Sequence, residues 1–386
     1  MKVAILNITG GGISGGHKKY LQNMLPLLSA SPEIEAILCA SPARMSAKEW
    51  LPRLANVSYC DCEPFIPFRH IPDSKLAASL DAFQPDVLFI PIERWINYKN
   101  LPVVTMLQNM APLAGVKTGA GIKEYLVAIA RRYETKIALT RANKVITPTE
   151  CVKDFLACNV GVPREKINSI HYGPTPPETS AKSPVTFPFR GRQFIFTAGS
   201  IEAYRGLEDI ILALPLVKKS FPEIKLAVAG GGRPQTLGYF ENLKKLASRL
   251  KVSDNIAWLG SINGAELSWC YANCSVFALT SRIESFCFVA LEAMSHGCSI
   301  VSTDSPCLPE VLGSTALYYK AGDELGLSSA LSSLLSQSAA DRIARSGKTL
   351  ERAASFSWEK AAVSTIDTLK AATNAGLPLA PNVLKT

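Results

Sequence analysis

The stretch SRIESFCFVALEAMSHGCSIVSTD, residues 281–304, carries two glutamates eight residues apart, Glu284 in a polar loop and Glu292 inside an apolar run. A buried and unpaired carboxylate is costly, so Glu292 requires a partner, either in the fold or in a ligand. The pattern predicts a helix from about Ser285 to Ser295, stopped by Gly297. Apolar runs of strand length flank this helix, CSVFALT before it and CSIVSTD after it.

The same alternation of apolar runs and helical patterns continues along the 386-residue chain. The first half has runs at 2–8, 35–41, 56–60, 87–92, 102–108, 144–149 and 167–173, and the second half at 194–199, 225–231, 256–260, 274–280, 298–304 and 316–319. Continuous apolar strands separated by helices imply parallel sheets covered on both faces. We therefore predict an α/β fold of two Rossmann-like, doubly wound domains facing a central cleft, with ligands at the carboxyl ends of the strands.

A stretch with five prolines, residues 173–188, separates the two halves. Few apolar residues occur in it, so it is predicted to be a linker. The expected division is a first domain at 1–175, a linker at 176–188, a second domain at 189–356, a closing helix at 357–373 and a flexible tail at 374–386.

Composition limits the class of protein. The chain is 47% hydrophobic, yet no window reaches the roughly 20 apolar residues that span a bilayer. The apolar run at the N-terminus is too short for a signal peptide and suits a first strand. The ten cysteines are scattered without a zinc-type C-x-x-C pair, and we expect reduced thiols in a cytoplasmic protein.

More than half of the net charge of +9 comes from residues 117–144, which hold seven basic and two acidic side chains. The apolar residues of this segment fall at helical spacing, at Ile122, Tyr125, Leu126, Ile129, Tyr133 and Ile137. Two interpretations stay open. The helix packs in the core with a solvated basic face, or it forms a surface that meets an anionic lipid or acceptor. Nucleic acid is not an expected partner, because few aromatic residues interleave with the charges.

A glycine-rich turn follows the first strand, in GGISGGHKKYL. Gly10, Gly12 and Gly15 match G-x-G-x-x-G, but the second strand ends without the acidic residue that holds a ribose. The P-loop pattern also fails, because His17 follows Gly16 where a lysine is required. What remains is either a turn without a ligand or a helix N-terminus whose amides can meet an anion.

The second half opens with TAGSIEAYRGLEDIILAL, in which Arg205 follows a strand and precedes a helix. Such an arginine can pair with a phosphate, or it is simply a surface residue. On a continuous helix, Glu284 and Glu292 would lie about 12 Å apart along the axis, the length of a sugar–diphosphate–ribose unit. The alternative for Glu292 is a half-exposed helix residue or a structural salt bridge.

These motifs together resemble retaining GT-B glycosyltransferases of family 4, the glycosyl transferases group 1. The stretch from Glu284 to Glu292 is similar to their E-x7-E motif, and segments near the N-terminus, around Arg205 and at FSWEKAA are similar to further family segments. The resemblance implies that Glu284 contacts the donor sugar and Glu292 the nucleotide ribose. It also implies an acceptor-binding first domain and a second domain that binds a nucleoside-diphosphate sugar, most often of UDP or GDP, without metal or other cofactor.

The chain departs from the family at three places. Ser200 stands where an arginine is common, the usual E-G-F-G loop is Glu284-Ser285-Phe286-Cys287, and Gln108 and Asn109 replace a cleft histidine. The predicted catalytic residues are Glu284, Arg205 and Asn109. The predicted donor contacts are Gly15, Gly16, Ser200, Arg205, Glu284, Ser285, Phe286, Cys287 and Glu292, and the predicted acceptor contacts are Gln108, Asn109 and His17.

The resulting hypothesis is sugar transfer from a nucleoside-diphosphate sugar to a glycan or lipid-linked acceptor, with retention of anomeric configuration. The segment QNMAP resembles a subset acting in bacterial surface-polysaccharide assembly. The basic segment 117–144 suggests a lipid-linked acceptor and a cytoplasmic enzyme that contacts the cytoplasmic face of the inner membrane. No metal site is expected, because D-x-D is lacking and the DCE at Asp61 is a poor candidate. A catalytically degenerate partner protein and a nucleotide-sugar epimerase are the alternatives.

Overall fold

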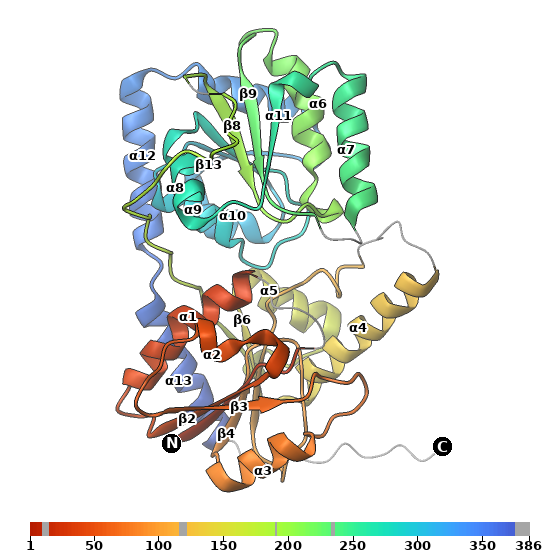
Figure 1. Ribbon diagram of the computed structural model, residues 1–386, viewed down its shortest axis with the longest axis vertical. Helices are drawn as coiled ribbons and strands as arrows, with labels where there is room; N and C mark the ends of the chain where they lie inside the picture. The colour runs from red at the N-terminus through yellow and green to blue at the C-terminus, as the bar shows by residue number, and fades with distance from the viewer. Residues whose placement is uncertain (10–14, 116–121, 190, 233–235, 375–386) are drawn as a thin grey trace. The chain divides into compact units, whose positions relative to one another are not determined.

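The computed structural model describes residues 1–9, 15–115, 122–189, 191–232 and 236–374 (Figure 1). The chain divides into two compact units. The first comprises the residues up to Gly173 together with the segment from Ser357 onward, and the second runs from Pro174 to Phe356.

The first unit is built on a seven-stranded parallel sheet of order β3-β2-β1-β4-β5-β6-β7. Its strands are β1 (Lys2–Leu6), β2 (Ala36–Pro42), β3 (Val57–Cys62), β4 (Val87–Ile90), β5 (Val103–Met106), β6 (Lys144–Thr147) and β7 (Ile167–Ser169). Its helices are α1 (Gly15–Ala30), α2 (Ala47–Trp50), α3 (Ser74–Phe83), α4 (Ile122–Arg141), α5 (Glu150–Phe155) and α13 (Trp358–Asn374). In the register of the sheet, Val3 lies opposite Ile37 on one side and Val87 on the other.

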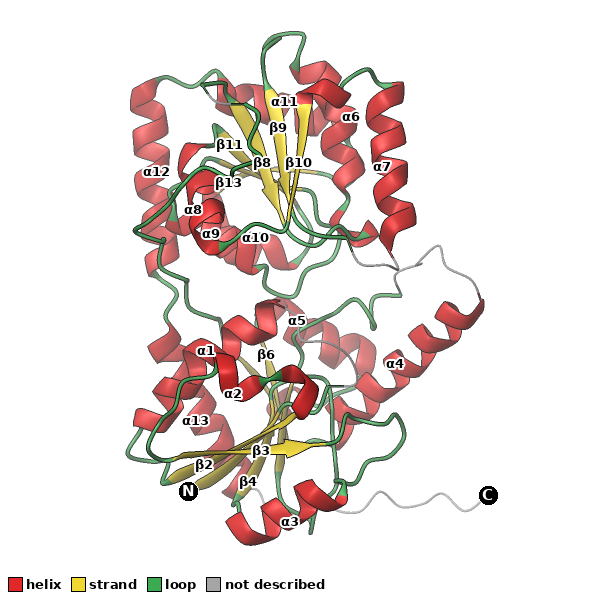
Figure 2. Cartoon of the chain, viewed as in Figure 1, coloured by secondary structure: helices red, strands yellow, loops and turns green. Residues whose placement is uncertain are grey.

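The second unit has a six-stranded parallel sheet of order β10-β9-β8-β11-β12-β13. Its strands are β8 (Phe194–Ala198), β9 (Lys225–Ala229), β10 (Ile256–Gly260), β11 (Val276–Leu279), β12 (Ile300–Thr303) and β13 (Ala316–Tyr319). Its helices are α6 (Leu207–Val217), α7 (Leu237–Arg249), α8 (Gly264–Asn273), α9 (Phe288–Ser295), α10 (Cys307–Leu312), α11 (Glu324–Leu335) and α12 (Ala339–Ala354). Figure 2 shows helices flanking the strands in both units.

All thirteen apolar runs in the sequence form strands, each parallel to its neighbours. The predicted α/β architecture of two Rossmann-like, doubly wound units is therefore confirmed. One prediction about a helix boundary is wrong. The helix expected from Ser285 begins only at Phe288, because Cys287 before it takes a left-handed backbone conformation with φ of 75°. Glu284 therefore lies outside α9, and the separation of about 12 Å expected from helix geometry does not apply to this pair.

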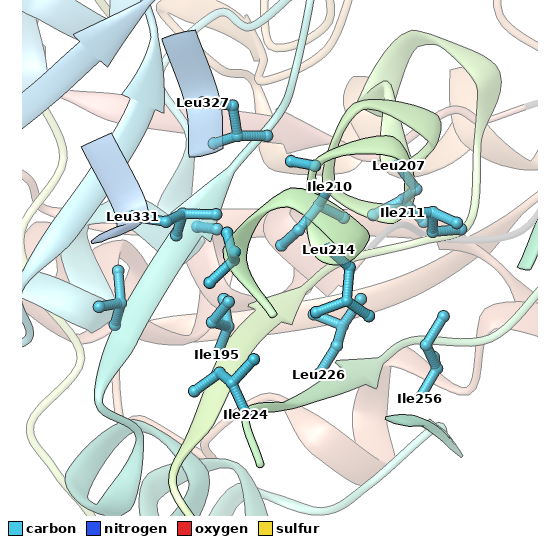
Figure 3. Close-up of a cluster of buried hydrophobic side chains, with 14 of the residues drawn as sticks. Ile195, Leu207, Ile210, Ile211, Leu214, Ile224, Leu226, Ile256, Leu327 and Leu331 are labelled. Carbon is cyan, nitrogen blue, oxygen red and sulfur yellow. The ribbon is translucent and has the colours of Figure 1, made fainter. Parts of the chain in front are cut away.

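Helix α6 is fixed by the core of the second unit. Four of its side chains, Leu207, Ile210, Ile211 and Leu214, pack against strand and α11 residues in the cluster drawn in Figure 3. Complete burial of an aliphatic side chain contributes about 1.5–3 kcal/mol. Because α6 begins two residues after Arg205, this packing also fixes the position of the turn Ala203–Arg205.

The last described helix, α13, belongs to the first unit. Its Trp358 ring stacks on Tyr172, with ring centroids 5.8 Å apart, and meets the edge of Tyr20 at 6.0 Å. A Cβ at Gly173 would lie 2.4 Å from Trp358, so the chain can pass under this ring only with glycine at that position.

All ten cysteines are free thiols. Within the described residues, no helix combines the length and the hydropathy needed to cross a bilayer.

Candidate functional site

A small hollow opens where β8 and β11 end in the second unit. Its walls come from Gly199 and Ser200 after β8, from Thr280 and Ser281 after β11, and from Arg205. Carboxyl ends of parallel strands are the usual ligand sites of such sheets. Two of the predicted donor contacts, Ser200 and Arg205, therefore lie together at this edge.

Arg205 and Glu284 form an ion pair beside the hollow. Arg205 Nη1 donates a hydrogen bond to Glu284 Oε1 and a second one, at 3.3 Å, to Ser281 Oγ. The two side chains are only 20% and 9% exposed. Burial by itself would lower the pKa of Arg205, but the Glu284 carboxylate outweighs burial and raises that pKa above its ordinary value.

The Nε–H group of Arg205 is a buried donor without a hydrogen-bond partner in the described part of the chain. A buried donor left without an acceptor costs about 1–3 kcal/mol. The guanidinium thus pairs with Glu284 through Nη1, while its Nε–H has no acceptor among the described residues.

The turn that carries Arg205 is held by hydrogen bonds to its carbonyl oxygens. Thr280 Oγ1 donates to the carbonyl oxygen of Arg205 at 2.6 Å, and Arg282 N donates to the carbonyl oxygen of Tyr204 at 2.8 Å. Gly206, with φ of 59°, is the N-cap residue of α6, and a Cβ there would lie 2.5 Å from the carbonyl oxygen of Thr280. This position therefore requires glycine both for its conformation and for space.

Behind this turn lies a charged network that the sequence analysis missed. Arg282 Nη2 lies 2.9 Å from Asp209 Oδ1 and 3.0 Å from Glu208 Oε1. Asp209 is 1% exposed and also accepts hydrogen bonds from the Tyr319 hydroxyl at 3.2 Å and the Gly322 amide at 2.9 Å. Asp209 stands inside the apolar run LEDIILAL, and an acid in an apolar run is the same signal that singled out Glu292.

A second missed residue is Gly230, at the end of β9. Its φ is 148°, and a Cβ at this position would lie 1.8 Å from the carbonyl oxygen of Gly199. The turns after β8 and β9 therefore approach each other too closely for any side chain at 230. The three consecutive glycines at 230–232 were the available signal.

The loop after Glu284 leads into α9. Ser285 and Cys287 are buried, and Phe286, which is 2% exposed, packs its ring against Phe288 and Phe356 with centroids 5.7 Å and 5.9 Å away. The Phe286 ring thus lies in the interior of the second unit. Burial, followed by the adjacent Glu284 carboxylate, raises the pKa of the Cys287 thiol well above its ordinary value.

Glu292 has a partner within the fold. Glu292 is 6% exposed, and its Oε2 accepts a hydrogen bond from the Tyr271 hydroxyl at 3.1 Å. The alternative of a half-exposed helix residue is therefore wrong. Next to it, His296 Nδ1 lies 2.8 Å from the Glu292 carbonyl oxygen, and Nε2 lies 2.9 Å from Ser268 Oγ. Burial and the Glu292 carboxylate raise the pKa of Tyr271 well above its usual range.

The first unit brings two predicted acceptor contacts together. His17 is 3% exposed, and burial lowers its pKa from 6.5 to about 4, against the opposing effect of a hydrogen bond with the Gln108 side chain. Gly15 and Gly16 form the first residues of α1, whereas Gly10 and Gly12 lie outside the described residues. The imidazole of His17 is therefore neutral over most of the pH range of the cell.

Asn109 lies on the turn after β5, where a carboxylate fixes the backbone. Glu93 Oε1 accepts hydrogen bonds from the amides of Gln108 at 2.6 Å and Asn109 at 2.7 Å. Burial raises the pKa of Glu93, and the two amides oppose that effect. The Asn109 side chain accepts from the Ala111 amide at 2.9 Å, which closes the turn. Glu93 was missed because the turn that it holds lies fifteen residues further along the chain.

Asp61 pairs with Lys48 at 3.3 Å on the surface. Over the ranges that the structure describes, no three His, Cys, Asp or Glu side chains are grouped so as to hold a metal ion.

Part of the second unit matches a described protein family. Residues 180–349 match the family described as Glycosyl transferases group 1. The matched segment is less than half of the 386 residues, and it contains Ser200, Arg205, Glu284 and Glu292. Over this segment the chain is similar to the glycosyl transferases group 1 family.

Two curated relatives illustrate the similarity. A D-inositol 3-phosphate glycosyltransferase of Streptomyces avermitilis is 23% identical over 410 residues, covering 96% of this chain and 86% of the relative. An uncharacterized glycosyltransferase of Haemophilus influenzae is 26% identical over 175 residues, covering 45% of each chain. The latter match thus spans less than half of that relative's length.

The fold has solved counterparts. The structure of Anabaena HepE in complex with UDP and glucose is similar, with a TM-score of 0.70 over 96% of this chain and 99% of that chain. Sequence identity is 17%, so this likeness concerns the fold alone. It is the two-domain GT-B fold.

Proposed function

We propose that this protein is a glycosyltransferase that moves a sugar from a nucleoside-diphosphate sugar to a glycan or lipid-linked acceptor. The observation that carries the proposal is the Arg205–Glu284 pair beside the hollow at the ends of β8 and β11, with the Arg205 Nε–H left without a partner. A diphosphate oxygen would satisfy that donor, and the family match over residues 180–349 supports the same reading.

The proposed reaction retains the anomeric configuration. The bond from the anomeric carbon to the diphosphate oxygen breaks, and the acceptor oxygen bonds to the same face of the sugar. The proton of the acceptor hydroxyl passes to an oxygen of the departing phosphate. Negative charge grows on the diphosphate during this step, and Arg205 together with the amides that begin α9 would stabilise it.

Glu284 would orient the sugar hydroxyls, and Glu292 would accept from the ribose hydroxyls. Glu292 already accepts from Tyr271, but a carboxylate has four lone-pair sites and can accept further bonds. Ser200 and the main chain of residues 285–287 would complete the donor contacts. Neither a metal ion nor another cofactor is part of this proposal, and transfer is expected to persist in a chelator.

His17, Gln108 and Asn109 are proposed acceptor contacts, with Gly15 and Gly16 as a contact for an anionic group. The contact between His17 and Gln108, and the fixed turn at Asn109, support this assignment. A neutral imidazole exchanges hydrogen bonds with sugar hydroxyls without adding charge.

A role in cell-surface polysaccharide biosynthesis, at the cytoplasmic face of the inner membrane, is proposed from the same evidence. The supporting observation is the basic α4, on which Arg131, Arg132 and Lys136 are exposed. Basic side chains near an anionic leaflet each contribute about 1 kcal/mol of attraction.

Thermal unfolding tests the donor assignment. The protein is heated with UDP, GDP, ADP, CMP or NAD at about 100 times the dissociation constant, where binding stabilises by about 2.7 kcal/mol. One nucleoside diphosphate should raise the midpoint by several degrees, and Glu292→Ala should remove this effect. The control Glu241→Ala removes an exposed carboxylate on α7 and should change nothing.

Transfer of labelled sugar to a membrane extract then separates the alternatives. Transfer that requires the extract supports the transferase. Donor turnover without any acceptor would indicate an epimerase, and donor binding without turnover would indicate a degenerate partner protein.

A further inference from the structure

Large exposed apolar side chains gather on one part of the first unit. Thirteen such residues occur in the described chain, and seven of them lie on two segments. The loop between β3 and α3, residues 63–73, contributes Ile66, Phe68 and Ile71, which are 52%, 58% and 57% exposed. Helix α4 contributes Leu126, Val127, Ile129 and Tyr133, between 44% and 59% exposed. A concentration of this kind marks an interaction surface.

The exposed apolar side chains of α4 argue against the interpretation that this helix packs its apolar stripe in the core. Leu126, Ile129 and Tyr133 belong to the apolar stripe that suggested a core-packed helix, yet their side chains are exposed. Toward its C-terminal end the helix buries Ala138 and Leu139 instead. The side chains of Ile122 and Tyr125, and residues 117–121, lie outside the described residues.

The loop and the helix are joined by a buried carboxylate. Glu134 of α4 is 4% exposed and accepts a hydrogen bond from the Phe68 amide at 2.7 Å. Its second oxygen lies 3.1 Å from His70 Nε2. The Phe68 and Tyr133 rings lie beside each other, with centroids 6.2 Å apart. Glu134 thus holds the loop against α4 and adds no negative charge to the outer surface.

The charged residues around this apolar surface are mainly basic. Arg69 of the loop and Arg131, Arg132 and Lys136 of α4 are exposed. The acids of the loop are engaged elsewhere, since Glu63 lies 3.9 Å from Lys75 and Asp73 caps the N-terminus of α3. Isolated apolar and aromatic side chains surrounded by cations are characteristic of surfaces that lie in the headgroup region of an anionic bilayer.

We propose that residues 63–73 form a membrane-contact loop, which inserts Ile66, Phe68 and Ile71 into an anionic bilayer beside α4. The apolar side chains would enter the boundary of the acyl chains, while Arg69 and the α4 cations stay with the lipid phosphates. The inference rests on the proposed membrane contact of α4 and adds a second, apolar element to it. It does not depend on the chemistry of sugar transfer.

The test is co-sedimentation of the full chain with two kinds of vesicle, phosphatidylcholine alone and phosphatidylcholine with about 30% phosphatidylglycerol. The second kind carries the negative surface charge that attracts basic segments. The variant Phe68→Ser/Ile71→Ser should lower the partition coefficient for anionic vesicles at least tenfold. A matched control, Val363→Ser, changes a residue that is 60% exposed on α13 and should leave partitioning unchanged. Since all three positions are on the surface, each variant is expected to keep the wild-type unfolding midpoint.

A charge variant separates the two elements. Arg131→Glu/Arg132→Glu should weaken binding mainly at low salt, whereas the loss in the loop variant should persist at high salt, because only charge is screened. If the charge variant loses binding and the loop variant does not, the loop inference is wrong while the α4 contact stands. If wild-type protein ignores anionic vesicles but still transfers sugar, membrane contact fails and the proposed function survives.

A second copy of the chain could also cover the exposed apolar side chains of the loop and α4, in a dimer. Light scattering after size-exclusion chromatography of the wild type and of Phe68→Ser/Ile71→Ser decides this point. A wild-type dimer that becomes a monomer in the variant would overturn the proposal, and a monomer in both supports it.

Discussion

Replacing Glu284 with glutamine should tighten the binding of a nucleoside diphosphate while it slows sugar transfer. In the present structure Arg205 donates to Glu284, and that carboxylate raises the pKa of the guanidinium. Glutamine keeps the shape and an acceptor oxygen but removes the charge. Arg205, which is 20% exposed, then becomes a largely buried cation without a counter-ion, and a bound diphosphate is the anion best placed to replace it.

The structure sets the size of both effects. Removing one member of a fully buried ion pair costs about 3–5 kcal/mol, and partial exposure of Arg205 reduces this to about 2 kcal/mol. The unfolding midpoint of a unit of this size should fall by about 4–8 °C. If the diphosphate recovers about 1.4 kcal/mol of the lost interaction, its dissociation constant falls about tenfold.

Isothermal titration with the nucleoside diphosphate selected by the thermal panel, UDP or GDP, measures this change. The matching nucleotide sugar should gain less than the free diphosphate, because its sugar loses the Glu284 contact. Glu208→Gln is the control, since Glu208 pairs with Arg282 at 3.0 Å and not with Arg205. Unchanged or weaker binding of the diphosphate to Glu284→Gln would refute the role of Arg205 as the diphosphate contact.

Three further predictions concern stability. Gly230→Ala should destabilise by more than about 2 kcal/mol in denaturant unfolding, because its Cβ would lie 1.8 Å from a carbonyl oxygen, whereas Gly238→Ala in α7 meets nothing within 4 Å and should stabilise slightly. Tyr271→Phe removes a hydrogen bond to the Glu292 carboxylate and should cost about 1.5–3 kcal/mol, and an unchanged free energy of unfolding would contradict this. The pKa of His17 is lowered to about 4 in the folded state, so only the unfolded chain gains this proton between pH 6.5 and 4. Stability should therefore fall by about 3 kcal/mol across that window, and the fall should be smaller in His17→Gln.

The strands were predictable because their signal is local. A parallel strand covered on both faces must be apolar throughout, and each such run in this chain became a strand. The start of α9 was not predictable in the same way. Cys287 takes a φ of 75°, a conformation that residues other than glycine rarely adopt, and nothing in the run Ser285–Ser295 signals a break.

The sequence predicted which residues belong to the candidate site but not which of them contact each other. Arg205 and Glu284 are 79 positions apart, and Glu292 is 21 positions from its partner Tyr271. The sequence indicated that Glu292 needs a partner, because burial of a lone carboxylate is costly, but an unaligned sequence cannot say which residue supplies it. The resemblance to a known family provided roles for these side chains, and the tertiary contacts provided their neighbours.

Helix α4 demonstrates a different limit. Its periodicity correctly identified an apolar stripe, but periodicity reports only that one side of a helix is apolar and not what covers it. Here Leu126, Ile129 and Tyr133 are exposed, and the buried acid Glu134 faces a loop from elsewhere in the first unit. An apolar stripe covered by a sheet and one exposed on the surface have the same periodicity.

The replacement of both loop glycines by Ser285 and Cys287 has a physical consequence for the ion pair. Left-handed backbone at a residue other than glycine costs about 1–2 kcal/mol, so Cys287 destabilises the loop. In exchange its buried side chain lies against Glu284 and Arg205, where a glycine would leave a gap. Excluding water from a charge pair lowers the local dielectric and strengthens the attraction between the partners. The loop thus combines backbone strain with a less hydrated Arg205–Glu284 pair, and the proposed contact between Arg205 and a diphosphate would be strengthened in the same way.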